Sequence, residues 1–286
     1  MIIKELSEAM GVSGAENHVR RILKQAVAPY ADEMWVDALG NLLVTQKGTG
    51  QTSMKVMLAA HMDEIGLMVT NIESNGTLRF KPVGGIDDRV VLGKTVKVGP
   101  DRIPGMIGGK PIHLLERSEE KSVVKMKKLF IDIGAKDKAD AQTKIKIGDR
   151  AVFATKFLDL GSTYMGKAFD DRVGCAVLAD VLENGPYPAD LHVAFTVQEE
   201  VGLRGARVAG YSLQPDVAFV VEGTICDDLP KDEDVSPVTE VGKGPALSVM
   251  DRTTISDPRL VSFLANVATT NEIPYQFRRT AGGGTD

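Results

Sequence analysis

Four short polar segments contain the residues that could do chemistry, and three of them directly follow apolar runs. His61 and Asp63 follow the run 56–60, Glu199 and Glu200 follow the run 193–197, and Glu222 follows the run 217–221. In an open α/β sheet, ligands bind outside the carboxyl ends of the strands. Imidazole and carboxylate groups are ligands for divalent metals such as zinc. Three strands that each deliver such a group to one edge predict a metal site there.

The fourth segment contains Asp170 and Asp171, just before a helical pattern over 173–182. Taken singly, an Asp at this point is more often a helix N-cap, and adjacent acids such as Glu199 and Glu200 are more often solvated. Asp63, however, lies two residues after His61, so both side chains face the same way on a strand. A carboxylate beside a metal-bound imidazole fixes its tautomer. The coincidence of the four signals favours a site.

Four motifs resemble the signatures of metallopeptidase family 42, which comprises glutamyl/leucyl and tetrahedral aminopeptidases, some of them labelled endoglucanases. The motifs are HMDEIG at 61–66, GKAFDDR at 166–172, QEEVG at 198–202 and GGGTD at 282–286. The resemblance covers essentially the whole chain. It implies a metallo-aminopeptidase that hydrolyses N-terminal residues from short peptides.

The resemblance also implies a role for each site residue. Asp170 would bridge two divalent ions, typically zinc or cobalt, with His61 and Glu222 completing one ion and Glu200 binding the other. Glu199 would be the general base, and Asp63 would orient His61. Many relatives have Asp where this chain has Glu222. A cis peptide bond between Asp170 and Asp171 is expected as well.

The family pattern continues past the motif at 282–286 to a further His that completes the second metal. The sequence ends at Asp286 and offers no candidate for this ligand. We therefore expect a C-terminally truncated chain whose second site lacks one ligand. We expect a polypeptide that stops there to be weak or inactive, although its full-length parent is active.

The apolar patterns predict an α/β protein with a mostly parallel central sheet flanked by helices, similar to zinc aminopeptidases. Glycines, prolines and short β-like runs between 69 and 157 predict an inserted, small β-barrel-like domain. The α/β domain would then comprise 1–68 and 158–286. Ser13 and Glu16 have the spacing of a capping box and predict the start of a helix. In relatives, the insertion makes dimers that build a tetrahedral dodecamer with inward-facing active sites.

The composition is that of an ordinary globular protein, with 43% hydrophobic residues, 26% charged residues and a net charge of −5. No basic stripe predicts nucleic-acid binding. The sequence contains no apolar run of about 18 residues that would span a membrane and no signal-peptide pattern at its start. With two separated cysteines, Cys175 and Cys226, expected to be free thiols, this predicts a cytoplasmic protein.

Two other functions remain possible from the residues. A non-catalytic peptide-binding or scaffold protein could use the same fold, although the retained Glu199 argues against it. A glycoside hydrolase would need two carboxylates facing each other about 5–9.5 Å apart, and Glu199 and Glu200 are sequence neighbours. The preferred N-terminal residue and the identity of the metal stay open, because such ligands accept zinc, cobalt and manganese.

Overall fold

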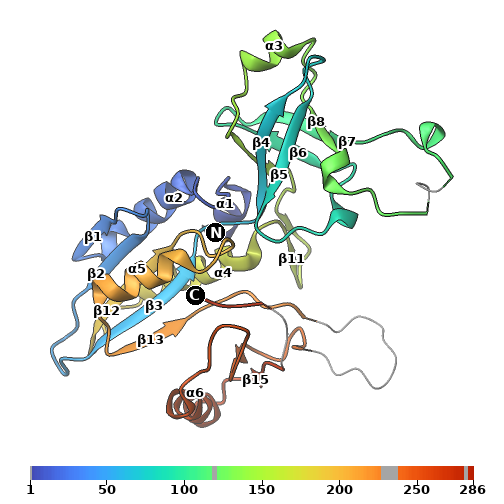
Figure 1. The fold of residues 1–286 in the computed structure, drawn as a ribbon. Coiled ribbons are helices and arrows are strands. Elements are labelled where there is room, and N and C mark those ends of the chain that lie inside the picture. Colours follow the sequence, from blue (N-terminus) through green and yellow to red (C-terminus); the bar gives the residue numbers. More distant parts are fainter. Residues whose placement is uncertain (1, 118–120, 227–237, 280–282) are drawn as a thin grey trace. The chain divides into compact units, whose positions relative to one another are not determined.

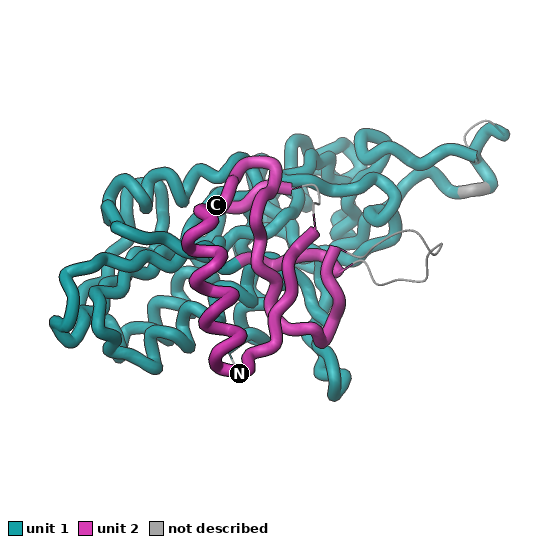
Figure 2. The backbone as a smooth tube through the Cα atoms, turned by 90° about the horizontal axis from the view of Figure 1, so that it is seen from below, with its two compact units in different colours: residues 1–221 teal, residues 222–286 magenta. Residues whose placement is uncertain are grey.

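The computed structural model describes residues 2–117, 121–226, 238–279 and 283–286. The chain forms two compact units, Met1–Val221 and Glu222–Asp286 (Figure 2). The predicted division into an α/β domain (1–68 and 158–286) and an insertion (69–157) stays a prediction.

A five-stranded sheet forms the base of the first unit, with strand order β1-β2-β12-β3-β13 (Figure 1). Its strands are β1 (Glu33–Val36), β2 (Leu42–Gln46), β3 (Lys55–His61), β12 (Asp190–Thr196) and β13 (Val217–Val220). Strands β12, β3 and β13 are parallel, whereas β1 and β12 both run antiparallel to β2.

The sheet is thus mixed, and the expectation of a mostly parallel sheet is not confirmed. The reason lies in the short connection between β1 and β2. Asp37 Oδ1 accepts hydrogen bonds from the backbone N–H groups of Leu39, Gly40 and Asn41, which closes a tight turn. A connection this short can join only antiparallel neighbours, since a parallel pair needs a crossover.

Helices cover both faces of this sheet, as predicted. They are α1 (Ile2–Glu8), α2 (Asn17–Val27) and α4 (Phe169–Glu183) on one face and α5 (Arg204–Leu213) on the other. Alternate residues of each strand serve the two layers. On β12, Val193 and Phe195 join the core under α1, α2 and α4, while Ala194 joins the core under α5.

The helix predicted near Ser13 begins later than the capping-box pattern indicates. Its N-cap is Glu16, which makes no side-chain capping bond. The Ser13 hydroxyl instead donates to Asp63. The capping box is therefore wrong, because a long-range partner takes the hydroxyl that the pattern assigned to the helix.

The predicted β module is a closed six-stranded barrel with order β4-β5-β8-β7-β6-β9. Its strands are β4 (Gly66–Ile72), β5 (Leu78–Val83), β6 (Thr95–Val98), β7 (Ile103–Gly108), β8 (Phe130–Asp132) and β9 (Arg150–Phe153). Pairing of β4 with β9 closes the barrel. Its buried core includes Leu67, Val96, Ile107 and Ile131. Closure protects strand edges that would otherwise be exposed to pairing with other chains.

Smaller elements complete the described chain. They are α3 (Lys138–Gln142), β10 (Leu158–Asp159) and β11 (Tyr164–Met165), with 3-10 helices at Ala28–Tyr30, Asp88–Val90, Ile112–Leu114 and Met126–Lys128.

The second unit contains β14 (Ala246–Leu247), α6 (Pro258–Thr270) and β15 (Gln276–Phe277). Strands β14 and β15 pair in parallel. The helix α6 has a favourable start: the Asp257 side chain accepts from the backbone N–H of Arg259, and Pro258 occupies the first turn, where its missing N–H costs nothing.

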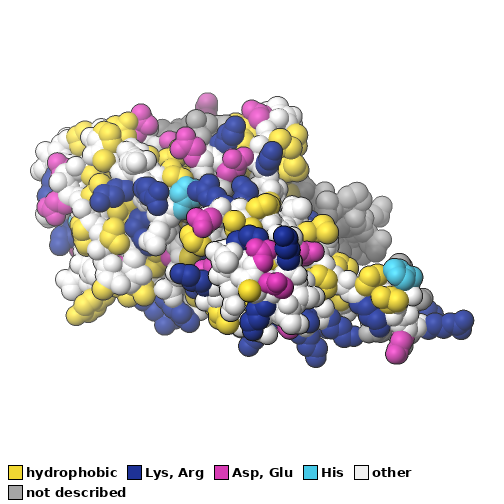
Figure 3. All heavy atoms as spheres, turned by 90° about the horizontal axis from the view of Figure 1, so that it is seen from above, with side chains coloured by type: hydrophobic (Ala, Val, Ile, Leu, Met, Phe, Trp, Pro, Cys, Tyr) yellow, Lys and Arg dark blue, Asp and Glu magenta, His cyan; other side chains and the backbone are white. Residues whose placement is uncertain are grey.

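On the face drawn in Figure 3, basic side chains lie among acidic and apolar ones. Within the described residues, no helix combines the length and the apolar character needed to cross a membrane.

Candidate active site

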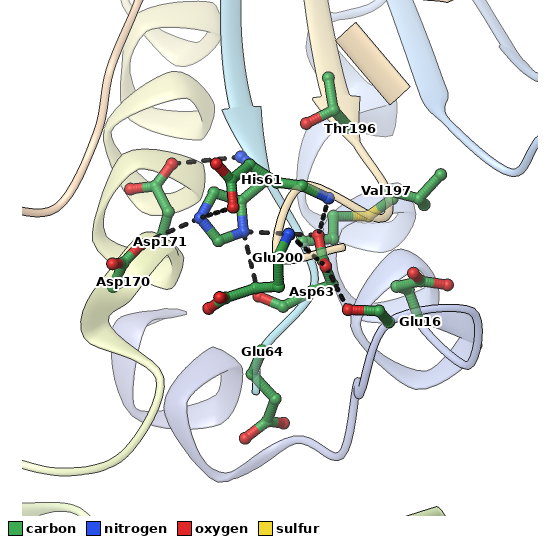
Figure 4. A network of polar contacts seen from close by, with 12 residues as sticks. Glu16, His61, Asp63, Glu64, Asp170, Asp171, Thr196, Val197 and Glu200 are labelled. Atoms are coloured by element: carbon green, nitrogen blue, oxygen red, sulfur yellow. Dashed lines mark hydrogen bonds and ion pairs between the residues drawn. The ribbon is translucent and has the colours of Figure 1, made fainter. Parts of the chain in front are cut away.

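His61 is the last residue of β3 and lies at the carboxyl edge of the sheet, as its sequence context predicts. Its side chain is 1% exposed. Nδ1 lies 3.1 Å from the backbone carbonyl oxygen of Asp63, and Nε2 lies 2.9 Å from Asp170 Oδ1 (Figure 4). If the neutral ring donates from Nδ1 to this carbonyl, Nε2 carries no proton and its lone pair lies on the side of Asp170.

The two adjacent aspartates at the start of α4 do different things. Asp171 is fully buried, and its carboxylate accepts from Gly174 N at 3.0 Å and from His61 N at 3.2 Å. Asp171 therefore caps the helix and ties it to β3, while the Asp170 side chain faces the His61 ring. The peptide bond between them is cis, as predicted.

Asp63 connects β3 to the segment that carries the two glutamates. Its Oδ1 accepts from Glu199 N at 3.0 Å, and its Oδ2 accepts from Glu200 N at 3.2 Å. Oδ1 also lies 3.5 Å from His61 Nδ1. Burial alone would raise the pKa of the Asp63 carboxyl, but His61 and hydrogen bonds from Ser13 and Glu199 N hold this pKa below its ordinary value. Asp63 is thus kept as a carboxylate.

Glu199 and Glu200 follow β12 and lie at the same edge as His61. Glu199 Oε2 is 4.0 Å from His61 Nε2, and its side chain is largely buried. Glu200 lies beside the barrel turn at Gly84, where a Cβ would come within 3.4 Å of Glu200 Oε2. The first unit therefore brings together five of the six predicted site residues: His61, Asp63, Asp170, Glu199 and Glu200.

The sixth predicted residue, Glu222, opens the second unit. It directly follows Val221, whose N–H donates to Ala59 O at 2.9 Å beside β3. Its own Oε1 accepts from Gly223 N at 3.1 Å. Its role as a ligand remains a proposal.

A second group of charged residues lies next to this site and was not predicted. Glu64 is 3.2 Å from the Arg172 guanidinium and 2.8 Å from Lys167 Nζ. Arg172 is fully buried and also donates to the carbonyl of Met62. Burial lowers the pKa of Lys167 to about 8, although the charge of Glu64 acts in the opposite direction. Only the position of Arg172 and Lys167 within the GKAFDDR motif signals them in the sequence.

The donor set around His61 fits divalent metal ions. One imidazole and several carboxylates are the mixture that zinc, cobalt and manganese accept. Two donors that each lie about 2.0–2.2 Å from one ion are about 3 Å apart. The separation of 2.9 Å between His61 Nε2 and Asp170 Oδ1 agrees with that spacing. The hydrogen bond at Nδ1 also leaves Nε2 as the nitrogen available to a metal.

Residues 40–286 match the family described as M42 glutamyl aminopeptidase. The chain belongs to this family. A putative aminopeptidase of Acetivibrio thermocellus is 38% identical over 286 residues, which are 100% of this chain and 83% of the relative. This M42 family member is therefore a hydrolase of the aminopeptidase class.

Solved structures of M42 relatives have the same fold. The TET aminopeptidase of the marine sediment archaeon Thaumarchaeota archaeon SCGC AB-539-E09 gives a TM-score of 0.94 at 39% identity and matches 100% of this chain and 82% of its own. The TET1 peptidase of Pyrococcus horikoshii, which can assemble into a tetrahedron or a large octahedral shell, gives 0.86 at 35% identity over 100% and 85%.

Proposed function

We propose that this M42 family member is a metal-dependent aminopeptidase that removes N-terminal residues from short peptides, with Glu199 as the general base. The observation that carries the proposal is the convergence of His61, Asp170 and Glu199 from three separate elements on one point at the sheet edge. Each element brings a potential metal ligand or base to that point. Acidic residues scattered over a surface would not be expected to gather around one buried imidazole in this way.

The residues divide naturally between two divalent ions, zinc or cobalt being our expectation. As the family resemblance implies, His61, Asp170 and Glu222 would hold the first ion, Asp170 and Glu200 would bind the second, and Asp170 would be shared by both. When bound, divalent ions supply Lewis-acid polarisation of a carbonyl and lower the pKa of bound water to as little as about 7.

The chain's own groups would move the protons. Glu199 would accept a proton from the water that attacks the scissile carbonyl, so the O–H bond breaks as the new C–O bond forms. When the C–N bond breaks, Glu199 would return this proton to the leaving amine. The partly buried position of Glu199, held by the bond from its N–H to Asp63, suits this exchange. Asp63 orients His61 and the glutamate segment in this scheme.

We also propose that the protein self-associates through its barrel, up to a tetrahedral dodecamer. The support is the shared fold with TET aminopeptidases. Several apolar side chains of the barrel region are exposed, including Met106 and Val90.

A panel of aminoacyl-p-nitroanilides tests the proposed function. The purified chain, with its mass confirmed, is assayed with zinc, with cobalt and with a chelator. From the full-length protein we expect release from free-amine substrates only, lost on chelation and restored by metal. Hydrolysis that continues in chelator, or equal cleavage of N-blocked substrates, would contradict the proposal. Metal binding without turnover of any substrate would favour a peptide-binding protein instead.

A further inference from the structure

The hydroxyl of Ser13 makes the shortest hydrogen bond to Asp63. Ser13 Oγ donates to Asp63 Oδ2 at 2.6 Å, and the two residues are 4% and 0% exposed. The same Oδ2 accepts from Glu200 N (Figure 4), while Oδ1 accepts from Glu199 N. Ser13, which is far from Asp63 in the sequence, therefore contacts the same carboxylate that accepts hydrogen bonds from the backbone of Glu199 and Glu200.

The plane of an aspartate carboxylate is set by its hydrogen bonds, because its terminal torsion has only a broad, two-fold preference. A bond of 2.5–2.7 Å between a hydroxyl and a carboxylate belongs to the stronger, charge-assisted class. The Ser13 bond falls in that range, whereas the two N–H bonds to Asp63 are 3.0 and 3.2 Å long. Of these three donors, Ser13 thus restrains the carboxylate most.

The loop that carries Ser13 is held against the strand segment that carries Asp63. Gly11 N donates to Glu64 Oε1 at 3.0 Å, and Glu64 N donates to Gly11 O at 3.0 Å. Val12 and Glu64 form a parallel bridge. A Cβ on Gly11 would lie 2.6 Å from Arg172 Nη2, so the loop can pack this closely only with glycine at that position. The hydroxyl therefore has a defined place relative to Asp63.

We infer that Ser13 is a positioning residue of the aminopeptidase site, which acts by fixing the Asp63 carboxylate and, through it, His61, Glu199 and Glu200. This inference rests on the proposed function. It also gives the N-terminal loop a part in catalysis, although the loop contributes no metal ligand.

Ser13→Ala tests the inference, with Ser7→Ala as the matched control. Ser7 is also fully buried in the N-terminal segment, but its hydroxyl donates to the backbone oxygen of Lys167 at 2.7 Å. Loss of a hydrogen bond to a charged group predicts that Ser13→Ala lowers kcat about 10- to 100-fold with little change in KM. Ser7→Ala is expected to lower the melting temperature comparably but to keep kcat within about threefold. Ser13→Cys, with a weaker S–H donor, should lie between Ala and the native residue, and it serves if Ser13→Ala does not fold.

A second readout does not depend on turnover. The affinity for Zn²⁺, measured by competition with a chromophoric chelator, should fall about 10-fold in Ser13→Ala and not in Ser7→Ala. Loss of a residue that orients metal ligands typically weakens metal binding by about this factor or more. In an Asp63→Asn background, Ser13→Ala should add less than about a twofold effect, because residues that act through one another are not additive.

Equal losses of kcat in Ser13→Ala and Ser7→Ala, or additive effects with Asp63→Asn on Zn²⁺ affinity, would overturn the role of Ser13 and leave the proposed function intact. A native chain that neither binds Zn²⁺ nor cleaves any substrate would instead overturn both.

Discussion

Two clusters of charged residues share the segment 61–64 at the end of β3, and they differ in their chemical make-up. Around His61, one imidazole meets the carboxylates of Asp170 and Glu199. Around Glu64, one carboxylate meets the ammonium of Lys167 and the guanidinium of Arg172. The first cluster has the composition of a metal site, whereas the second contains its own counter-charges.

The difference shows how neighbouring buried charges can have separate roles. In the second cluster the buried carboxylate of Glu64 lies between two cationic side chains, which also donate to backbone carbonyls. Disruption of such a structural arrangement leaves an uncompensated buried charge. This cluster joins β3 to the start of α4 and to the N-terminal loop. A group of imidazole and carboxylates at a strand edge is instead suited to bind a cation and do chemistry.

The largest effect is expected in the metal-type cluster. Glu199→Gln keeps the shape of the side chain but removes its basicity, so kcat should fall about 10²- to 10⁴-fold. Zn²⁺ affinity should change far less. The measurement is steady-state kinetics on the preferred aminoacyl-p-nitroanilide, and a kcat within threefold of the native value would exclude Glu199 as the base.

In the second cluster, stability rather than catalysis should respond most. Glu64→Gln leaves Lys167 and Arg172 buried without their anion, which predicts a loss of about 3–5 kcal/mol in the free energy of unfolding. The control is Glu73→Gln, because Glu73 pairs with Arg79 at 2.9 Å on the surface and should contribute at most about 1 kcal/mol. Urea unfolding measures both variants. Equal losses would show that burial does not distinguish the two pairs.

A smaller effect concerns pH. The pKa of Lys167 is about 8 in the folded protein, against an ordinary value of 10.5. Between these values the unfolded chain keeps a proton that the folded protein releases, so the free energy of unfolding should rise with pH across this window. The gain is at most about 3 kcal/mol. Below pH 8, both states hold the proton and this contribution to the slope vanishes. Lys167→Met should remove the slope between pH 8 and 10.5 in urea titrations, and an unchanged slope would contradict the lowered pKa.

The sequence predicted the parts of the fold whose patterns are local. The apolar run 217–221, the helical pattern over 173–182 and the glycine-rich β module all lie close to where the sequence predicts them. The mixed sheet was not foreseen, because an apolar strand such as β2 has the same pattern in either direction. The turn that decides the direction depends on three backbone N–H groups that donate to Asp37 Oδ1, which the sequence alone does not show.

The sequence predicted only the part of the site that depends on local patterns. Residues at strand ends converge because sheet geometry brings strand ends together, and His61 and Glu199 follow that rule. Asp170 reaches the same point from the start of α4. Ser13 was assigned to a helix cap, because its real partner lies fifty residues away and no local spacing indicates it. Arg172 looks like any surface arginine in the sequence, and only the packing around it shows that it is buried.

The most direct test of the account is a titration of the metal-free protein with Zn²⁺ at 25 °C, in competition with a chromophoric chelator. The native chain is compared with Asp170→Asn from the first cluster and with Glu64→Gln from the second, each confirmed to be folded by circular dichroism. We predict that Asp170→Asn weakens Zn²⁺ binding at least about 100-fold, since it removes the charge of a proposed direct ligand, while Glu64→Gln stays within about threefold of the native chain. Equal affinities in all three proteins, or no Zn²⁺ binding by the native chain, would contradict the assignment of the His61 cluster as a metal site.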